Sequence, residues 1–192
     1  EQECGLILYL LVLYHTILFK NMLKSCFQFT DQAEKFYIKK RDYGDDKTYT
    51  CHSAQRVQSF GNNTYMYKLA AKNGGETIAY DVLVEAIKTG THQKENGAKY
   101  PENPHDRPRE HRIMTKNSEN YCFVVVVSFD DNQYGCFVLM RADKADEDVP
   151  DECDRVYKQE CGEKSVTLYK GKKSVRGNVK LKCISVRKRS VT

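Results

Sequence analysis

The stretch that decides the fold class is NYCFVVVVSF at residues 120–129, which is followed by DDNQYG at 130–135 and CFVLMRA at 136–142. Four consecutive valines are stiff at χ1, which disfavours a helix, and they pack well on a pleated sheet. The polar segment between the two apolar runs is typical of a turn. We therefore predict two antiparallel strands joined as a hairpin.

The same alternation of β-like segments and turns extends toward the N-terminus. KNGG at 72–75 is a glycine-rich hairpin signal, and GDDK at 44–47 separates another pair of β-like segments. Closely spaced strands without helices between them favour an antiparallel sandwich or barrel over βαβ units. The further predicted strands are 35–43, 50–60, 64–71, 76–87 and 178–186.

One segment interrupts this pattern with prolines and charges. Residues 92–111, HQKENGAKYPENPHDRPREH, hold three of the four prolines of the sequence. This composition predicts a long exposed loop. The histidines of the segment, His92, His105 and His111, are expected to be exposed in that loop.

A second segment, DECDRVYKQEC at 151–161, predicts a short helix. It is polar and lacks Gly and Pro, and Val149-Pro150 and Gly162 suit its start and its end. One helical face would carry Cys153, Val156, Tyr157 and Cys161. Both thiols should therefore face one surface, where they can form bridges to strands beneath the helix.

The most hydrophobic run of the chain is CGLILYLLVLYHTILF at residues 4–19. It has the length of a signal-peptide core and is shorter than a membrane-spanning helix; a buried N-terminal helix is the alternative. Because the sequence starts at Glu1 rather than Met, we expect a fragment in which residues 1–25 are signal-like and are removed. A single folded domain is then expected at 26–192.

Eight cysteines are dispersed along the sequence, and no two are closer than eight positions. Zinc ligands usually come in close pairs, so no metal site is expected, and an even set behind a secretory signal predicts disulfides. NNT at 62–64 is a sequon that predicts N-glycosylation of Asn62. Together these features predict a secreted, extracellular protein. The cysteines are residues 4, 26, 51, 122, 136, 153, 161 and 183.

Charge and motifs argue against several classes of function. The 31 basic and 26 acidic residues are spread along the chain, so a nucleic-acid partner is not expected. The sequence contains no G-x-S-x-G, no H-E-x-x-H and no glycine-rich phosphate loop. We therefore expect neither an enzyme nor a cofactor.

Four segments in a characteristic order carry a family resemblance. They are FYIKKRDYGDD…C at 36–51, YCFVVVV at 121–127, GCFVLM at 135–140 and VPDECDRVYKQEC at 149–161. They resemble the tick salivary lipocalins of the histamine-binding-protein family, over roughly residues 30–185. The resemblance implies an all-β fold, an eight-stranded antiparallel up-and-down lipocalin barrel with a short C-terminal α-helix packed on the barrel wall.

The resemblance also implies three disulfides, Cys51–Cys183, Cys122–Cys153 and Cys136–Cys161. Spacing alone leaves the pairing open, because six cysteines permit fifteen connectivities. Cys4 and Cys26 are left over. If a signal peptide is cut between them, Cys26 is an unpaired thiol.

The amine sites of the family use acids and aromatic residues to meet a cation inside the barrel. By resemblance, Phe137 stands where the family has its binding glutamate and Leu139 where it has a tryptophan, and the sequence contains no Trp at all. The candidate ligand-binding residues are Tyr43, Asp45, Asp46, Asp31, Phe137 and Leu139.

Three functions remain open at this point. The first is a secreted, monomeric lipocalin that sequesters histamine or another biogenic amine and so suppresses host inflammation. Because Phe137 would make the pocket apolar, the second is a scavenger of an eicosanoid such as a leukotriene or thromboxane, whose carboxylate would meet Lys39 or Arg41. The third is a protein-binding inhibitor of complement or clotting that uses the 92–111 loop and the barrel as a scaffold.

Overall fold

The computed structural model describes residues 32–44, 48–169, 171 and 183. The signal-like segment 1–25 lies outside these residues, as do the candidate site residues Asp31, Asp45 and Asp46. Of the strand predicted at 178–186, only Cys183 is described. The domain boundary at residue 26 and this last strand therefore remain predictions.

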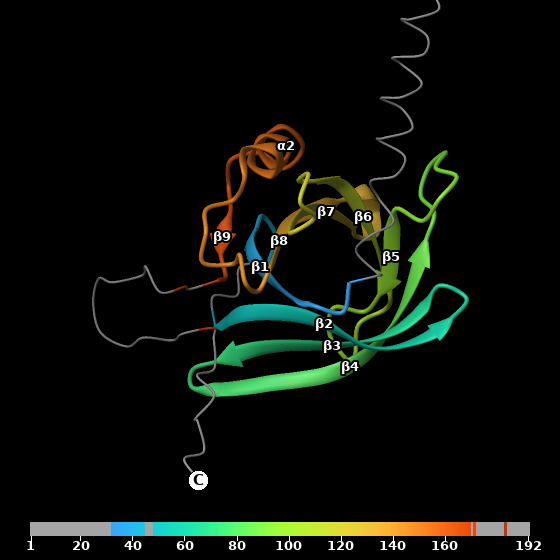
Figure 1. The fold of residues 1–192 in the computed structure, drawn as a ribbon, viewed down its shortest axis with the longest axis horizontal. Helices are drawn as coiled ribbons and strands as arrows, with labels where there is room; N and C mark the ends of the chain where they lie inside the picture. The colour runs from blue at the N-terminus through green and yellow to red at the C-terminus, as the bar shows by residue number, and fades with distance from the viewer. Residues whose placement is uncertain (1–31, 45–47, 170, 172–182, 184–192) are drawn as a thin grey trace, which may run out of the picture.

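The strands of the described chain close into an antiparallel barrel (Figure 1). Each strand from β2 to β7 pairs with the next one in sequence, and β1 pairs with both β8 and β2. The predicted eight-stranded up-and-down barrel is thus confirmed. Its strands are β1 (Lys35–Arg41), β2 (Tyr49–Gly61), β3 (Thr64–Asn73), β4 (Glu76–Ile87), β5 (Gly97–Tyr100), β6 (Arg109–Lys116), β7 (Cys122–Ser128) and β8 (Tyr134–Arg141), and a short β9 (Val166–Thr167) adds to β1.

Strand β7 is apolar from Cys122 to Val127 because both of its faces are buried there. Val124 and Val126 face outward and pack with Tyr157 of the C-terminal helix. Phe123 and Val125 face inward, into the barrel core. A strand that is covered on both faces carries a continuous apolar run instead of an alternating one.

The pairing of β7 with β8 sets the direction of two candidate site residues. Val125 lies opposite Phe137, and Phe123 lies opposite Leu139, so all four side chains share the inner face. A slip of one residue would turn Phe137 toward the outside. Phe137 and Leu139 therefore point into the barrel.

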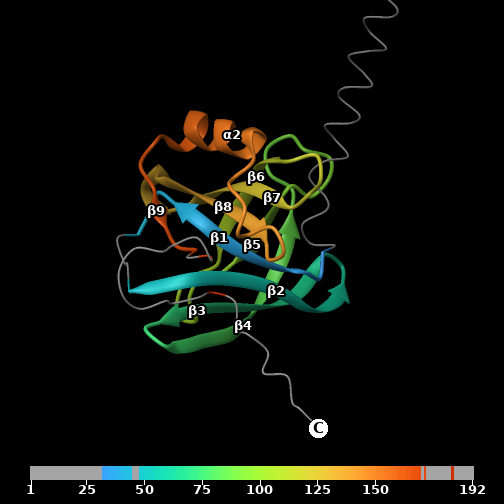
Figure 2. The ribbon, with the colours of Figure 1, turned by 60° about the vertical axis from the view of Figure 1, so that its left-hand side comes forward.

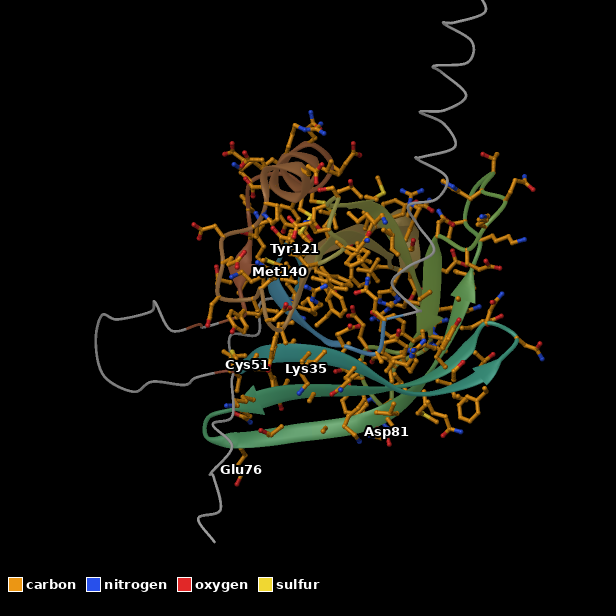
Figure 3. All side chains as sticks on the ribbon, in the orientation of Figure 1. Lys35, Cys51, Glu76, Asp81, Tyr121 and Met140 are labelled. Atoms are coloured by element: carbon orange, nitrogen blue, oxygen red, sulfur yellow. A yellow bond between two sulfur atoms is a disulfide. The ribbon has the colours of Figure 1, made fainter. Side chains whose placement is uncertain are left out.

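The predicted helix at 151–161 is confirmed as α2 (Asp151–Cys161), which covers β7 and β8 from outside (Figure 2). Acidic residues in its first turn suit the helix N-terminus, and Gly162, at φ 79°, ends it. Beneath the helix lie Met140 and Tyr121 (Figure 3). Within the described residues, no helix combines the length and the apolar character of a membrane-spanning segment.

Three disulfides hold the helix and the C-terminal segment to the barrel. Cys122–Cys153 and Cys136–Cys161 join α2 to β7 and β8, and Cys51–Cys183 joins β2 to the C-terminal segment. These are the pairs that the family resemblance implied. By constraining the unfolded chain, each stabilises the fold by about 2–4 kcal/mol.

The prediction of a long exposed loop at 92–111 is wrong. The segment contains all of β5 and the start of β6, which pair with each other and complete the barrel between β4 and β7. β5 has only four residues, too few to give a clear strand pattern in the sequence. The three prolines all lie between the two strands, where no ladder N–H is needed. The surface loop that the inhibitor hypothesis requires is thus reduced to two short segments, 92–96 and 101–108.

The prediction that the histidines of this segment are exposed is wrong for one of them. His92 and His105 are exposed, but His111, on β6, is only 2% exposed. Cross-strand pairing with Val127 of β7 places His111 on a strand of the barrel wall and not in a loop. Its side chain lies in the barrel interior.

The packing of α2 predicts a large loss of stability for one substitution of Tyr157 and a small change for another. This ring is 1% exposed, and its hydroxyl has no hydrogen-bond partner among the described residues. We expect Tyr157→Ala to lower the free energy of unfolding by about 3–5 kcal/mol. Tyr157→Phe, which keeps the ring, should change it by less than about 1 kcal/mol. Denaturant unfolding with the disulfides intact measures both, and equal losses would contradict the packing described here.

Candidate ligand-binding site

A cavity of about 300 Å³ lies inside the barrel. This volume is at the lower end of the range found for small-molecule sites, about 300–1,000 Å³. Most of the lining is aliphatic or aromatic, and it includes Ile38, Leu69, Tyr67, Tyr80, Phe137 and Leu139. A neighbouring space of about 20 Å³, lined also by His111 and Glu95, is too small for an organic ligand.

The described candidate residues divide between the cavity wall and the layer behind it. Phe137 and Leu139 line the cavity. Tyr43 is not part of the lining; its ring packs against Phe129 and Phe137, with centroids 5.1 and 6.5 Å away. Tyr43 thus lies behind the lining. Its hydroxyl contacts a lining residue that the sequence did not predict, Glu102.

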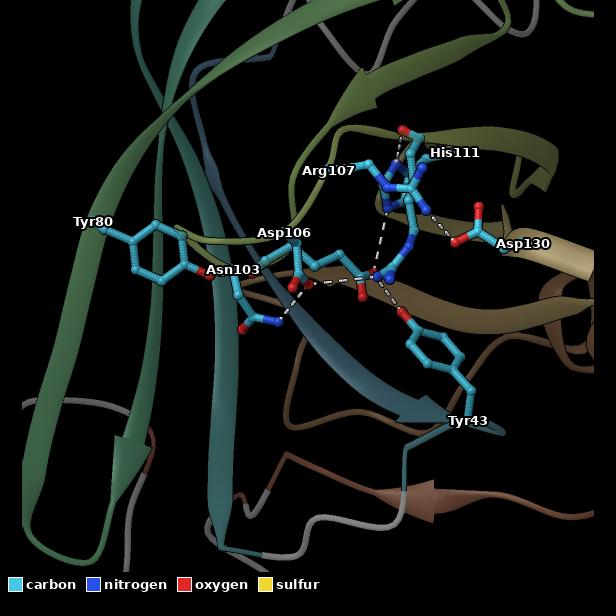
Figure 4. A network of polar contacts seen from close by, with 9 residues as sticks. Tyr43, Tyr80, Asn103, Asp106, Arg107, His111 and Asp130 are labelled. Atoms are coloured by element: carbon cyan, nitrogen blue, oxygen red, sulfur yellow. Dashed lines mark hydrogen bonds and ion pairs between the residues drawn. The ribbon is translucent and has the colours of Figure 1, made fainter.

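Glu102 brings a carboxylate to the cavity from the loop between β5 and β6. Its Oε1 accepts a hydrogen bond from the Tyr43 hydroxyl at 2.6 Å and lies 3.3 Å from Nε2 of His111. Figure 4 shows Tyr43 and His111 directed toward this carboxylate from two sides. Oε2 of Glu102 has no hydrogen-bond or ion-pair partner among the described residues.

Contacts around the loop fix the position of Glu102. The Tyr80 hydroxyl donates to the backbone carbonyl of Glu102, and the Arg107 guanidinium contacts Asp130 at 2.6 Å (Figure 4). The Arg107–Asp130 pair is highly exposed and contributes little energy, but it joins this loop to the β7–β8 connection. The loop thus turns its acid inward, and the side chain of Glu102 is only 19% exposed.

His111 orients the carboxylate from the barrel wall. Its Nδ1 lies 3.0 Å from the Arg109 carbonyl oxygen, so both ring nitrogens face acceptors, and the contact with Glu102 is an ion pair when the ring is protonated. The ring also stacks on Tyr100, with centroids 3.8 Å apart. This packing leaves His111 little freedom to move away from Glu102.

The surroundings keep Glu102 ionised. Burial acts to raise the pKa of Glu102, but the hydrogen bonds from His111 and Tyr43 and the charges of His111 and Arg41 together hold it below its usual value. Burial and the nearby Glu102 charge raise the pKa of Tyr80 to about 12, and the same two causes hold the pKa of Tyr43 and of Tyr100 well above its usual value. At neutral pH the site therefore combines one carboxylate with uncharged tyrosines.

A cation also lines the cavity. Arg41, at the end of β1, has a buried Nε without a hydrogen-bond partner among the described residues, and its guanidinium lies 5.1 Å from the centre of the Tyr43 ring. Lys39, the other cation considered from the sequence, is engaged elsewhere. Its Nζ donates to the carbonyls of Ala145 and Glu147 at 2.6 and 3.0 Å.

Within the described residues, one group of side chains has the composition of a metal site, Asp42 with Cys136 and Cys161. The two cysteines form a disulfide, so their thiolates are not available as ligands. The Asp42 carboxylate accepts a hydrogen bond from the backbone N–H of Cys136 at 2.6 Å. This cluster is therefore structural.

A closed eight-stranded antiparallel barrel with an internal cavity and a helix on its wall defines a lipocalin, a class of ligand-binding proteins. Within this class the chain belongs to the tick histamine binding protein family, whose family model matches residues 19–175. No protein with a curated description is similar enough in sequence to count as a match.

Solved structures show the same fold at low sequence identity. Japanin from Rhipicephalus appendiculatus, bound to cholesterol, is similar with a TM-score of 0.54 and 11% identity, over 71% of this chain and 93% of that one. Lobster apocrustacyanin A1 is similar with a TM-score of 0.50 and 12% identity, over 71% of this chain and 77% of that one. These similarities concern the fold alone.

The lowered pKa of Glu102 predicts an acid-dependent contribution to stability. A carboxylate whose pKa is lower in the folded than in the unfolded state stabilises the fold above its unfolded pKa, about 4.3, and this contribution is lost as the pH falls through the folded value. In Glu102→Gln, the free energy of unfolding should fall less steeply with acid below about pH 5 than in the wild type. Glu110→Gln, at an exposed residue of β6, is the control and should keep the wild-type slope. Equal slopes in all three proteins would contradict the described role of Glu102.

Proposed function

We propose that this protein is a secreted, monomeric lipocalin that binds and sequesters a small cationic amine, with histamine as the first candidate, and that it acts in this way against host inflammation. The observation that carries the proposal is the carboxylate of Glu102, largely buried at the cavity with Oε2 unpartnered among the described residues. A buried carboxylate with an open acceptor favours a cation that donates hydrogen bonds.

The rest of the cavity suits a small aromatic amine. Tyrosine rings such as Tyr67 and Tyr80 can add cation–π attraction, and Phe137 and Leu139 supply apolar surface for a ring. Glu102 compensates for the acid that is missing at Phe137 of β8, since it supplies a carboxylate from the β5–β6 loop. Asp31, Asp45 and Asp46 remain predicted contributors.

Calorimetry with histamine and serotonin tests the amine proposal. We expect micromolar or tighter binding to the wild type. Glu102→Gln should weaken it by about 30-fold or more, since removing one partner of a desolvated charge pair typically loses 2–5 kcal/mol.

Glu110→Gln is the matched control for this experiment, because it also removes one negative charge, but at an exposed position of β6. This variant should bind the amine like the wild type. Thermal unfolding of each variant separates a loss of binding from a loss of folding. Full amine affinity in a folded Glu102→Gln variant would refute the proposed role of Glu102, and the absence of amine binding by the wild type would refute the amine proposal.

A second candidate function rests on Arg41. Arg41 lines an apolar cavity, and its buried Nε has no hydrogen-bond partner among the described residues, which favours an anionic group on a fatty ligand. The ligand class would be an eicosanoid whose carboxylate meets Arg41 and whose chain lies along Ile38 and Leu69.

Leukotriene binding separates the two candidates. If the ligand is an eicosanoid, Arg41→Gln should weaken its affinity by about tenfold or more, while Lys39→Gln, which removes a cation outside the cavity, should leave it unchanged. If calorimetry detects no eicosanoid binding by the wild type, or if both variants bind equally well, this second candidate is excluded.

A further inference from the structure

The turn between β2 and β3 presents the only N-x-S/T sequon of the sequence, Asn62-Asn63-Thr64. Asn62 and Asn63 have φ values of 48° and 61°, as in the tight two-residue turns that close hairpins. Asn62 is exposed, and the Thr64 hydroxyl donates to the Asn62 carbonyl at 3.3 Å. The amide of Asn62 is thus offered to solvent at the tip of an ordered hairpin.

The same hairpin exposes several apolar side chains near its tip. Tyr65 and Tyr67 are buried, so the alternate residue Met66 faces outward, opposite Leu83 of β4, which is 57% exposed. The pairing of β2 with β3 shifts register at Val57 and at Phe60, and these two side chains are 49% and 50% exposed. We call Val57, Phe60, Met66 and Leu83 the tip patch.

We propose that Asn62 carries an N-linked glycan whose first N-acetylglucosamine lies on the ring of Phe60 and shields the tip patch from water. A pyranose ring has a face of C–H groups that packs on the electron-rich face of an aromatic ring. Only Gly61 separates Phe60 from Asn62, and no atom lies within 4 Å of the position that a Cβ of Gly61 would occupy. The space beside the asparagine is therefore open to a sugar.

The position of the turn leaves the ligand site free. In an up-and-down barrel successive turns alternate between the two ends, so the β2–β3 turn lies at the end away from the β5–β6 loop of Glu102. Figure 1 shows the β2–β3 hairpin extending from the barrel at the opposite end of the ribbon from the β3–β4 turn. The glycan would thus act on stability and solubility, independently of any ligand.

The experiment uses the full chain secreted from insect cells, as wild type, Phe60→Ser and Tyr134→Ser. Tyr134, on β8 and 64% exposed, is the control for the loss of an exposed aromatic residue. Each protein is compared before and after treatment with a peptide N-glycosidase, which leaves Asp at position 62. Asp tolerates the left-handed backbone of this position, so the turn is retained. Peptide mass mapping reports the occupancy of Asn62, and thermal unfolding reports stability.

Glycan removal should lower the Tm of the wild type and of Tyr134→Ser by about 2–4 °C and change that of Phe60→Ser much less. The difference between these shifts isolates the contact between the sugar and Phe60, as in a double-mutant cycle. An unmodified Asn62 in the secreted protein would overturn the proposal. An equal shift in Phe60→Ser, or no shift in the wild type, would overturn the contact with Phe60.

Discussion

The pairing of β1 with β8 on one side and β2 on the other is the constraint on which the cavity depends. Without this closure, the inner faces of the strands would form one side of an open sheet with two unprotected edges. Closure turns those faces into the wall of a cavity, and it brings Arg41, at the end of β1, to the same interior as Phe137 of β8. The helix and its two disulfides strengthen the wall from outside at β7 and β8.

Within this closed barrel, the burial of one carboxylate determines the chemistry of the site. A carboxylate removed from water needs donors or a cation, and Glu102 has Tyr43 and His111 on one of its oxygens. The described protein leaves the other oxygen without a partner. The cation of an amine ligand would supply the partner that this second oxygen of Glu102 lacks.

The sequence predicted the parts of the fold that local rules determine. The valine run and the polar helix between Pro150 and Gly162 each have a pattern that indicates one structure, and both were found as predicted. The β5 and β6 strands were both missed. β5 has four residues, too few to give a period, and β6 begins inside the proline-rich segment that predicted a loop, so His111 was placed in that loop. Nothing in the local sequence distinguishes Glu102 from the other charges of its loop. Its role comes from pairing between β5 and β6 and from contacts with Tyr43 and Tyr80, which are distant in sequence.

The central claim is that the barrel interior receives a cation at Glu102. A crystal structure of the oxidised protein with histamine tests it most directly. The account predicts histamine inside the barrel, with one nitrogen about 2.7–2.9 Å from Oε2 of Glu102. Histamine bound outside the barrel, or bound inside with no nitrogen within hydrogen-bond distance of Glu102, would contradict it.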